Sequence, residues 1–110
     1  MMEIKINKKT ERMAIMAISG RITAATAPEI KEQIKKLVSE GWVELILDLS
    51  ETTFIDSSGL SAFVSGLKQT KENNGKFRLA ALNNDVYSIF KITMLDKIFE
   101  LYPTVDLAIN

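Results

Sequence analysis

The chain has 110 residues, of which 46% are hydrophobic and 25% charged, and 14 basic residues balance 14 acidic ones. These values fit a single globular domain over residues 1–110, with no basic excess for binding nucleic acid. The absence of cysteine and histidine excludes disulfides, zinc–sulfur sites and a Ser–His–Asp triad within the chain, so we expect no enzyme, metal site or cofactor.

The N-terminal stretch MMEIKINKKTER is charged and lacks the apolar core of a signal peptide. No later segment approaches the roughly 18 apolar residues that a membrane span needs. We therefore expect a cytoplasmic protein without a membrane partner. The first predicted elements are two antiparallel strands at residues 3–7 and 13–19, joined by the polar turn NKKTER.

TAATAPEIKEQIKKLVSEG, residues 23–41, predicts the first helix. Thr26 and Glu29 have the spacing of a capping box, and Pro28 falls in the first turn, where its missing N–H costs little. Gly41 is suited to end the helix. Apolar residues recur at helical spacing along one stripe: Ile30, Ile34, Leu37 and Val38. The charged residues beside them predict a solvated face: Lys31, Glu32, Lys35 and Lys36.

WVELILDL, residues 42–49, is almost continuously apolar, which predicts a central strand covered on both faces. An extended piece follows at 54–55, and then a second helix, which carries Leu60, Phe63, Val64 and Leu67 at helical spacing and ends at ENNG (72–75). The sequence next predicts a strand at 76–82 and a third helix capped by Asn84 or Asp85. The last predicted elements are a short strand at 97–101 and a helix at 105–109.

The order of predicted elements is therefore ββαβαβα(β)α. Strands that alternate with helices predict parallel pairing with right-handed crossovers, whereas the opening hairpin adds an antiparallel pair. The fold class is α/β: a mixed β-sheet with an opening hairpin and helices packed mainly on one face.

FIDSSGL, residues 54–60, joins the second extended piece to the second long helix. Asp56, Ser57 and Ser58 all carry short oxygen acceptors suited to a helix N-cap, and Gly59 lets another backbone approach closely. A helix needs only one N-cap residue, so capping accounts for one of these side chains and not for all three. The pattern leaves open whether Asp56 or Ser57 is the cap. The alternative role for a serine here is that of a phosphoacceptor presented to another protein.

Phosphorylation at this junction would add a charge of roughly −1.5 to −2 beside Asp56. A helix N-terminus tolerates such charge within the folded domain. A partner packed flat over the same spot would have to bury a dianion beside a carboxylate. Phosphorylation could therefore switch binding off and leave the fold intact.

FIDSSGLSAF, preceded by LILDLSETT, resembles the signature of the STAS domain, and more narrowly that of bacterial anti-sigma-factor antagonists. The resemblance extends over nearly the whole chain, in the order and spacing of its elements. Ile18-Ser19-Gly20, KEQIKKLV, NNGKFRLAAL and MLDKIF support it, while DSSGL with LDL upstream is its more specific part.

This resemblance implies a partner-switching mechanism. An anti-sigma factor, which is a serine kinase with the histidine-kinase ATPase fold, binds the unphosphorylated antagonist and so releases a sigma factor. The kinase phosphorylates the first serine after the motif's aspartate, which is Ser57 here, and a separate phosphatase restores the protein. By motif position, Asp56 orients the hydroxyl, and Ser58 and Gly59 shape the contact surface.

The chain departs from the family pattern after the second strand, where members often carry G-(E/D)-(I/L)-D and this chain has Gly20-Arg21-Ile22-Thr23. Arg21 and Thr23, as part of the partner-binding surface, replace two acids, and Arg21 could pair with a phosphate because guanidinium forks suit phosphate oxygens. These changes favour an alternative, a STAS module that acts as a non-switching scaffold in a signalling complex.

A second alternative is a receiver-like domain that accepts phosphate on an aspartate, for which Asp48 in LILDLS has a suitable position. A receiver also needs an acidic pair after its first strand to hold magnesium, and a lysine near a late strand. The first strands here are followed by NKKTER and GRIT, which contain no such pair.

Overall fold

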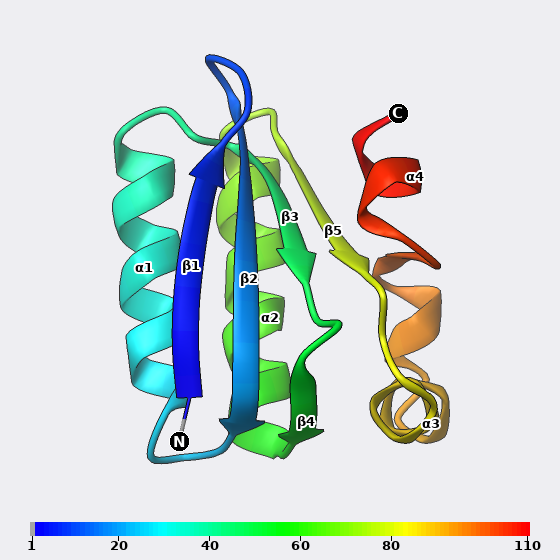
Figure 1. The fold of residues 1–110 in the computed structure, drawn as a ribbon. Helices are drawn as coiled ribbons and strands as arrows, with labels where there is room; N and C mark the ends of the chain where they lie inside the picture. The colour runs from blue at the N-terminus through cyan, green and yellow to red at the C-terminus, as the bar shows by residue number, and fades with distance from the viewer. Residues whose placement is uncertain (1) are drawn as a thin grey trace.

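The computed structural model describes residues 2–110, which form a six-stranded sheet with four α-helices (Figure 1). The strands are β1 Met2–Lys8, β2 Met13–Ile22, β3 Glu44–Asp48, β4 Thr52–Ile55, β5 Lys76–Ala80 and β6 Glu100–Tyr102. The helices are α1 Ala27–Ser39, α2 Ser57–Glu72, α3 Asn84–Ile92 and α4 Val105–Ile109, with a 3-10 turn at Leu95–Lys97.

The sheet is mixed, as predicted. Its strand order is β1-β2-β3-β5-β6; β1 runs antiparallel to β2, and the other neighbours along this path are parallel. Strand β4 pairs parallel with the last three residues of β2, and the register shifts within this pairing, between Gly20 and Arg21. The hydroxyl of the buried Thr52 donates to the Ile18 carbonyl over 2.7 Å, which ties the start of β4 to β2.

Helices α1 and α2 lie side by side on one face of the sheet (Figure 1). In the core four buried phenylalanines pack together, with the ring centroids of neighbouring pairs 5.8 to 6.4 Å apart: Phe63, Phe77, Phe90 and Phe99. The short helix α4 covers part of the opposite face, where a smaller buried cluster contains Met13, Ile15, Ile46, Ala80 and Ala108. Strand β3 is therefore covered on both faces, which explains its continuous apolar run.

The predicted capping box at the start of α1 is wrong. Thr26 has near-helical backbone angles, and its side chain caps no N–H group of the helix. Its hydroxyl instead donates to the Arg21 carbonyl over 3.0 Å and accepts from the Thr23 N–H over 2.9 Å, so the loop before the helix takes up its hydrogen bonds. Pro28 does lie in the first turn, and Gly41, at φ +96°, follows the helix end.

Three further boundaries differ from prediction. The third strand begins at Glu44 rather than Trp42, because the 42–43 segment completes the turn after α1. The cap of α3 is Asn83, whose side chain accepts from Val86 N–H, rather than Asn84 or Asp85. On α2, Val64 is 43% exposed, although its spacing placed it on the apolar stripe.

Candidate functional site

Asp56 is the residue that caps helix α2. Its backbone is extended, and its Oδ1 accepts hydrogen bonds from the N–H groups of Ser58 (2.9 Å) and Gly59 (3.2 Å). Its own N–H donates to the Ile22 carbonyl over 3.0 Å, which fixes the start of the helix against the end of β2. The structure thus decides between the two capping candidates, Asp56 and Ser57.

Ser57 is the first residue of α2, and its side chain is exposed. Because Asp56 provides the cap, the Ser57 hydroxyl is not needed to hold the helix start. The next two residues lie deeper: Ser58 is half-buried and Gly59 is buried. The FIDSSGL junction therefore presents one hydroxyl outward and uses the neighbouring residues to build the helix beneath it.

Gly59 lies against the sheet, beneath the surface that Ser57 presents. A Cβ on Gly59 would come within 2.6 Å of both Ile22 Cγ2 and Ile55 Cγ1, so only glycine lets α2 approach β2 and β4 this closely. Any effect of Gly59 on a contact surface is consequently indirect, through the position of the helix.

A hollow of about 340 Å³ lies between the starts of α1 and α2. Both helices begin at the same end of the sheet (Figure 1). It is lined by Ala24, Ala27, Pro28, Lys31, Ser57, Ser58 and Ser61. The sequence predicts only a solvated face for Lys31, whereas in the structure Lys31 lines this hollow together with Ser57. The sequence does place Lys31 near the start of its helix, one turn after Pro28. It does not show that the starts of α1 and α2 lie next to each other, because this depends on the complete fold.

Thr23 belongs to the turn that borders this hollow. Its hydroxyl accepts from the Ala25 N–H over 3.2 Å, and its carbonyl accepts from the N–H groups of Thr26 and Ala27. A carboxylate at position 23 could accept the same bond from Ala25. Threonine therefore holds this turn without a negative charge.

Arg21 lies over a phenyl ring rather than beside the serines. Its guanidinium carbon is 4.3 Å from the centroid of Phe54. Successive strand side chains point to opposite faces, and Ile22 and Ile55 are the ones that meet α2, so Arg21 and Phe54 lie on the other face. The structure does not bring Arg21 to Ser57.

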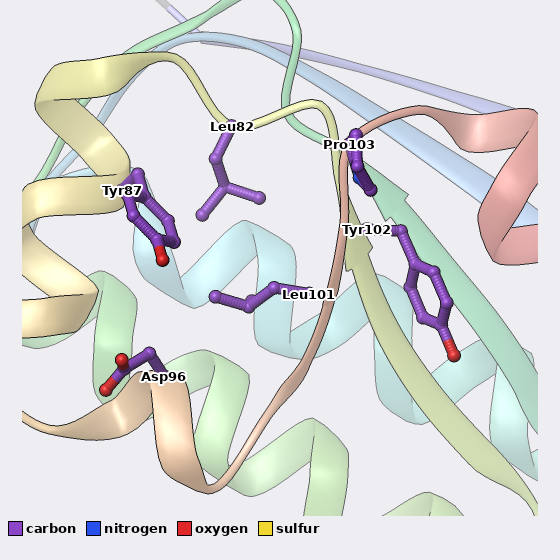
Figure 2. Close-up of a pocket in the computed structure, with 6 residues that line it drawn as sticks. All are labelled: Leu82, Tyr87, Asp96, Leu101, Tyr102 and Pro103. Atoms are coloured by element: carbon purple, nitrogen blue, oxygen red, sulfur yellow. The ribbon is translucent and has the colours of Figure 1, made fainter.

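A second hollow, of about 410 Å³, lies near the C-terminal edge of the sheet (Figure 2). Figure 2 shows Leu82 and Leu101 pointing into the space beside Tyr87 and Asp96, while the Tyr102 ring points away. None of the predicted site residues lines it. Within residues 2–110 there is also no cluster of three acidic side chains placed to hold a metal, and no helix with the length and apolarity to cross a bilayer.

The chain thus combines a mixed sheet, two helices packed side by side and an exposed serine at the start of one of them. The STAS domain family model matches residues 5–108, and the chain belongs to this family. The chain is 32% identical over 99 residues to the anti-sigma-B factor antagonist of Listeria monocytogenes, covering 90% of this chain and 85% of that protein. The corresponding Bacillus subtilis protein is 30% identical over 94 residues, 86% of this chain and 85% of its own length.

A solved structure of an anti-sigma factor antagonist from Mycobacterium paratuberculosis superposes with a TM-score of 0.89 at 28% identity. The match covers 99% of this chain and 92% of that one. Because the chain belongs to the STAS family, the alternative prediction of a receiver-like domain is wrong. Asp48, the residue on which that alternative depended, accepts a hydrogen bond from Ser50 N–H at the end of β3.

Proposed function

We propose that this chain is an anti-sigma-factor antagonist that acts by binding a protein rather than by catalysis. Without phosphate it binds an anti-sigma factor and so releases a sigma factor; phosphorylation of Ser57 ends the binding. The names of the Listeria and Bacillus relatives support the class of partner. The observation that carries the switch is the exposed Ser57 side chain, freed from capping by Asp56.

The position of Ser57 suits a switch that acts on binding alone. Its side chain projects from the first turn of α2, so a phosphate there displaces nothing from the core. A docked partner would bury a charge of roughly −1.5 to −2 next to the carboxylate of Asp56. A penalty of about 4 kcal/mol would weaken the complex nearly a thousandfold.

The partner in this proposal is an anti-sigma factor that is itself a serine kinase of the histidine-kinase ATPase fold, with a phosphatase as the opposing enzyme. The proposed contact surface consists of Ser57 and Ser58 on α2 together with the turn at Thr23. The predicted partner residue Arg21 lies over Phe54 on the other face of the sheet and is therefore not part of this surface.

The test combines intact mass with binding. Purified protein is incubated with the cognate kinase and Mg-ATP, and wild type is compared with Ser57→Ala and with the control Ser58→Ala. We expect one added phosphoryl group on wild type and Ser58→Ala and none on Ser57→Ala. Calorimetry should then show that the phosphorylated wild type no longer binds the kinase, whereas Ser57→Ala binds it with or without ATP.

The second candidate is a STAS scaffold that binds without switching. The uncharged turn at Thr23 and the commitment of Arg21 to Phe54 favour it, since two acids frequent in the family pattern are replaced here. In the same experiment a scaffold gains no phosphate, or gains one that persists in Ser57→Ala. Its binding to a partner is equal in the presence and absence of ATP.

A further inference from the structure

A phosphate on Ser57 would meet a helix start at which three N–H groups, those of Ser58, Gly59 and Leu60, are already in use. Asp56 Oδ1 accepts from Ser58 N–H at 2.9 Å and from Gly59 N–H at 3.2 Å. The Asp56 carbonyl takes the next N–H, that of Leu60, at 3.0 Å. These are three of the four N–H groups that normally stabilise an anion at a helix N-terminus. The dianion would also have the Asp56 carboxylate as its neighbour in the chain, so a nearby cation would stabilise the phosphorylated form.

The available cation lies on α1. Lys31 and Ser57 line the same hollow, and among the described residues that line it Lys31 is the only charged one. Glu29, the acid in the first turn of α1, does not line the hollow, and Arg21 lies over Phe54 on the other face of the sheet. The hollow is open to solvent, so a phosphoryl group on Ser57 can extend into it.

We propose that Lys31 pairs with the phosphate of phosphorylated Ser57 and holds it in the hollow between α1 and α2. This inference rests on the proposed phosphorylation of Ser57 and assigns the residue that stabilises the phosphorylated form. A lysine suits the task because its ammonium is a compact charge on a flexible four-carbon stem, which can follow the phosphate. The pairing favours the dianion over the monoanion and so lowers the pKa of the second phosphate ionisation from its ordinary value of about 6.

The experiment measures the pKa of this second phosphate ionisation. Phosphoserine is incorporated at position 57 during translation, and the phosphorus NMR signal is followed against pH in wild type, Lys31→Gln and Lys35→Gln. Lys35 is one turn further along α1, does not line the hollow, and controls for the loss of one positive charge. We expect Lys31→Gln to raise the phosphate pKa by about half a unit and Lys35→Gln to leave it near the wild-type value.

High salt should shrink the difference between wild type and Lys31→Gln, because the pair is near the surface. The assignment is overturned if Lys31→Gln titrates as wild type does, or if Lys35→Gln shifts the phosphate pKa as far as Lys31→Gln. Neither outcome bears on the kinase test, because the phosphate is installed without a kinase. Conversely, a failure of the kinase to modify Ser57 would overturn the proposed switch whatever this titration shows.

Discussion

Asn83 joins helix α3 to the start of strand β4 through a hydrogen bond from its Nδ2 to the Thr52 carbonyl, 2.8 Å long. The same side chain caps the helix, since its Oδ1 accepts from the Val86 N–H over 2.9 Å. A single amide thus fixes both the helix start and its place beside the strand that leads to Ser57.

Replacing Asn83 with alanine removes both bonds. We expect Asn83→Ala to lower the free energy of unfolding by about 2 kcal/mol, about 1 for the cap and about 1 for the bond to Thr52. Urea unfolding followed by circular dichroism measures the loss. The matched control is Asn84→Ala, one residue on, which should stay within about 0.5 kcal/mol of wild type. A larger loss in Asn84→Ala would contradict the assignment of the cap.

Gly59→Ala tests the close contact between α2 and the sheet. The added Cβ meets Ile22 Cγ2 and Ile55 Cγ1 at 2.6 Å, and neither atom is the free end of a long flexible side chain. Overpacking of this kind costs about 1 to 3 kcal/mol, which should appear as a lower urea midpoint with an unchanged slope. Ser61→Ala, at an exposed position on the same helix, should be nearly neutral. Equal stability of the two variants would show that the helix can shift to accommodate the methyl.

We expect substitutions of Asp56 and Ser57 to have different effects on the free energy of unfolding. Asp56→Ala leaves the N–H groups of Ser58 and Gly59 without their acceptor, so we expect a loss of about 1 kcal/mol in urea unfolding. Ser57→Ala should lie within about 0.5 kcal/mol of wild type, because its exposed side chain has no part in the cap. If Ser57→Ala proved the more destabilising change, the serine would be structural, and its availability for modification would be in question.

Much of the fold could be predicted because apolar periodicity is a local property of the chain. The stripe on α1 and the run in β3 identified these elements, and the FIDSSGL junction indicated the site. Competition between neighbouring acceptors could not be resolved in the same way. At 83–85 three adjacent residues can each cap a helix, and the structure selects Asn83 because its amide also reaches the Thr52 carbonyl.

Contacts between segments that are distant in the sequence could not be predicted from the sequence either. The spacing of Thr26 matched a capping box, yet its hydroxyl donates to the Arg21 carbonyl, which only the loop geometry brings near. The pairing of β4 with the end of β2 depends on a register shift after Gly20 that leaves no periodic signal. Lys31 belongs to the candidate site only because α1 and α2 begin at the same end of the sheet.

Ala81 stores backbone strain that glycine should relieve. It has a φ of +61°, in the left-handed region, at the point where β5 ends, and its N–H donates to the Tyr102 carbonyl over 3.0 Å. Relief of about 1 to 2 kcal/mol outweighs the greater entropy of glycine in the unfolded chain, so Ala81→Gly should gain about 0.5 kcal/mol in urea unfolding. Ala80→Gly, in the strand and fully buried, should instead lose about 1 kcal/mol or more. A loss in both variants would contradict the strain at Ala81.

Tyr102 provides a prediction that depends on pH. Its hydroxyl donates to Glu100 Oε1 over 2.8 Å, and this hydrogen bond, followed by burial and the Glu100 charge, raises the pKa of Tyr102 above its ordinary value. The chain has two tyrosines, so in Tyr87→Phe the absorbance of tyrosinate reports Tyr102 alone. We expect it to titrate above about pH 10. Glu100→Gln in the same background should lower the Tyr102 pKa, because it removes the negative charge that opposes ionisation.

The sign of the linked stability follows from the direction of this shift. The folded pKa of Tyr102 lies above the unfolded one, so the native state holds the phenolic proton more tightly, and the stabilisation is fully present below about pH 10. It is lost as the pH rises through the folded pKa. The difference in unfolding free energy between the protein and Tyr102→Phe should therefore be constant around neutral pH. Above about pH 10 the protein with Tyr102 should lose stability relative to Tyr102→Phe. A difference that stays constant across this range would show that the bond to Glu100 does not distinguish the folded chain from the unfolded one.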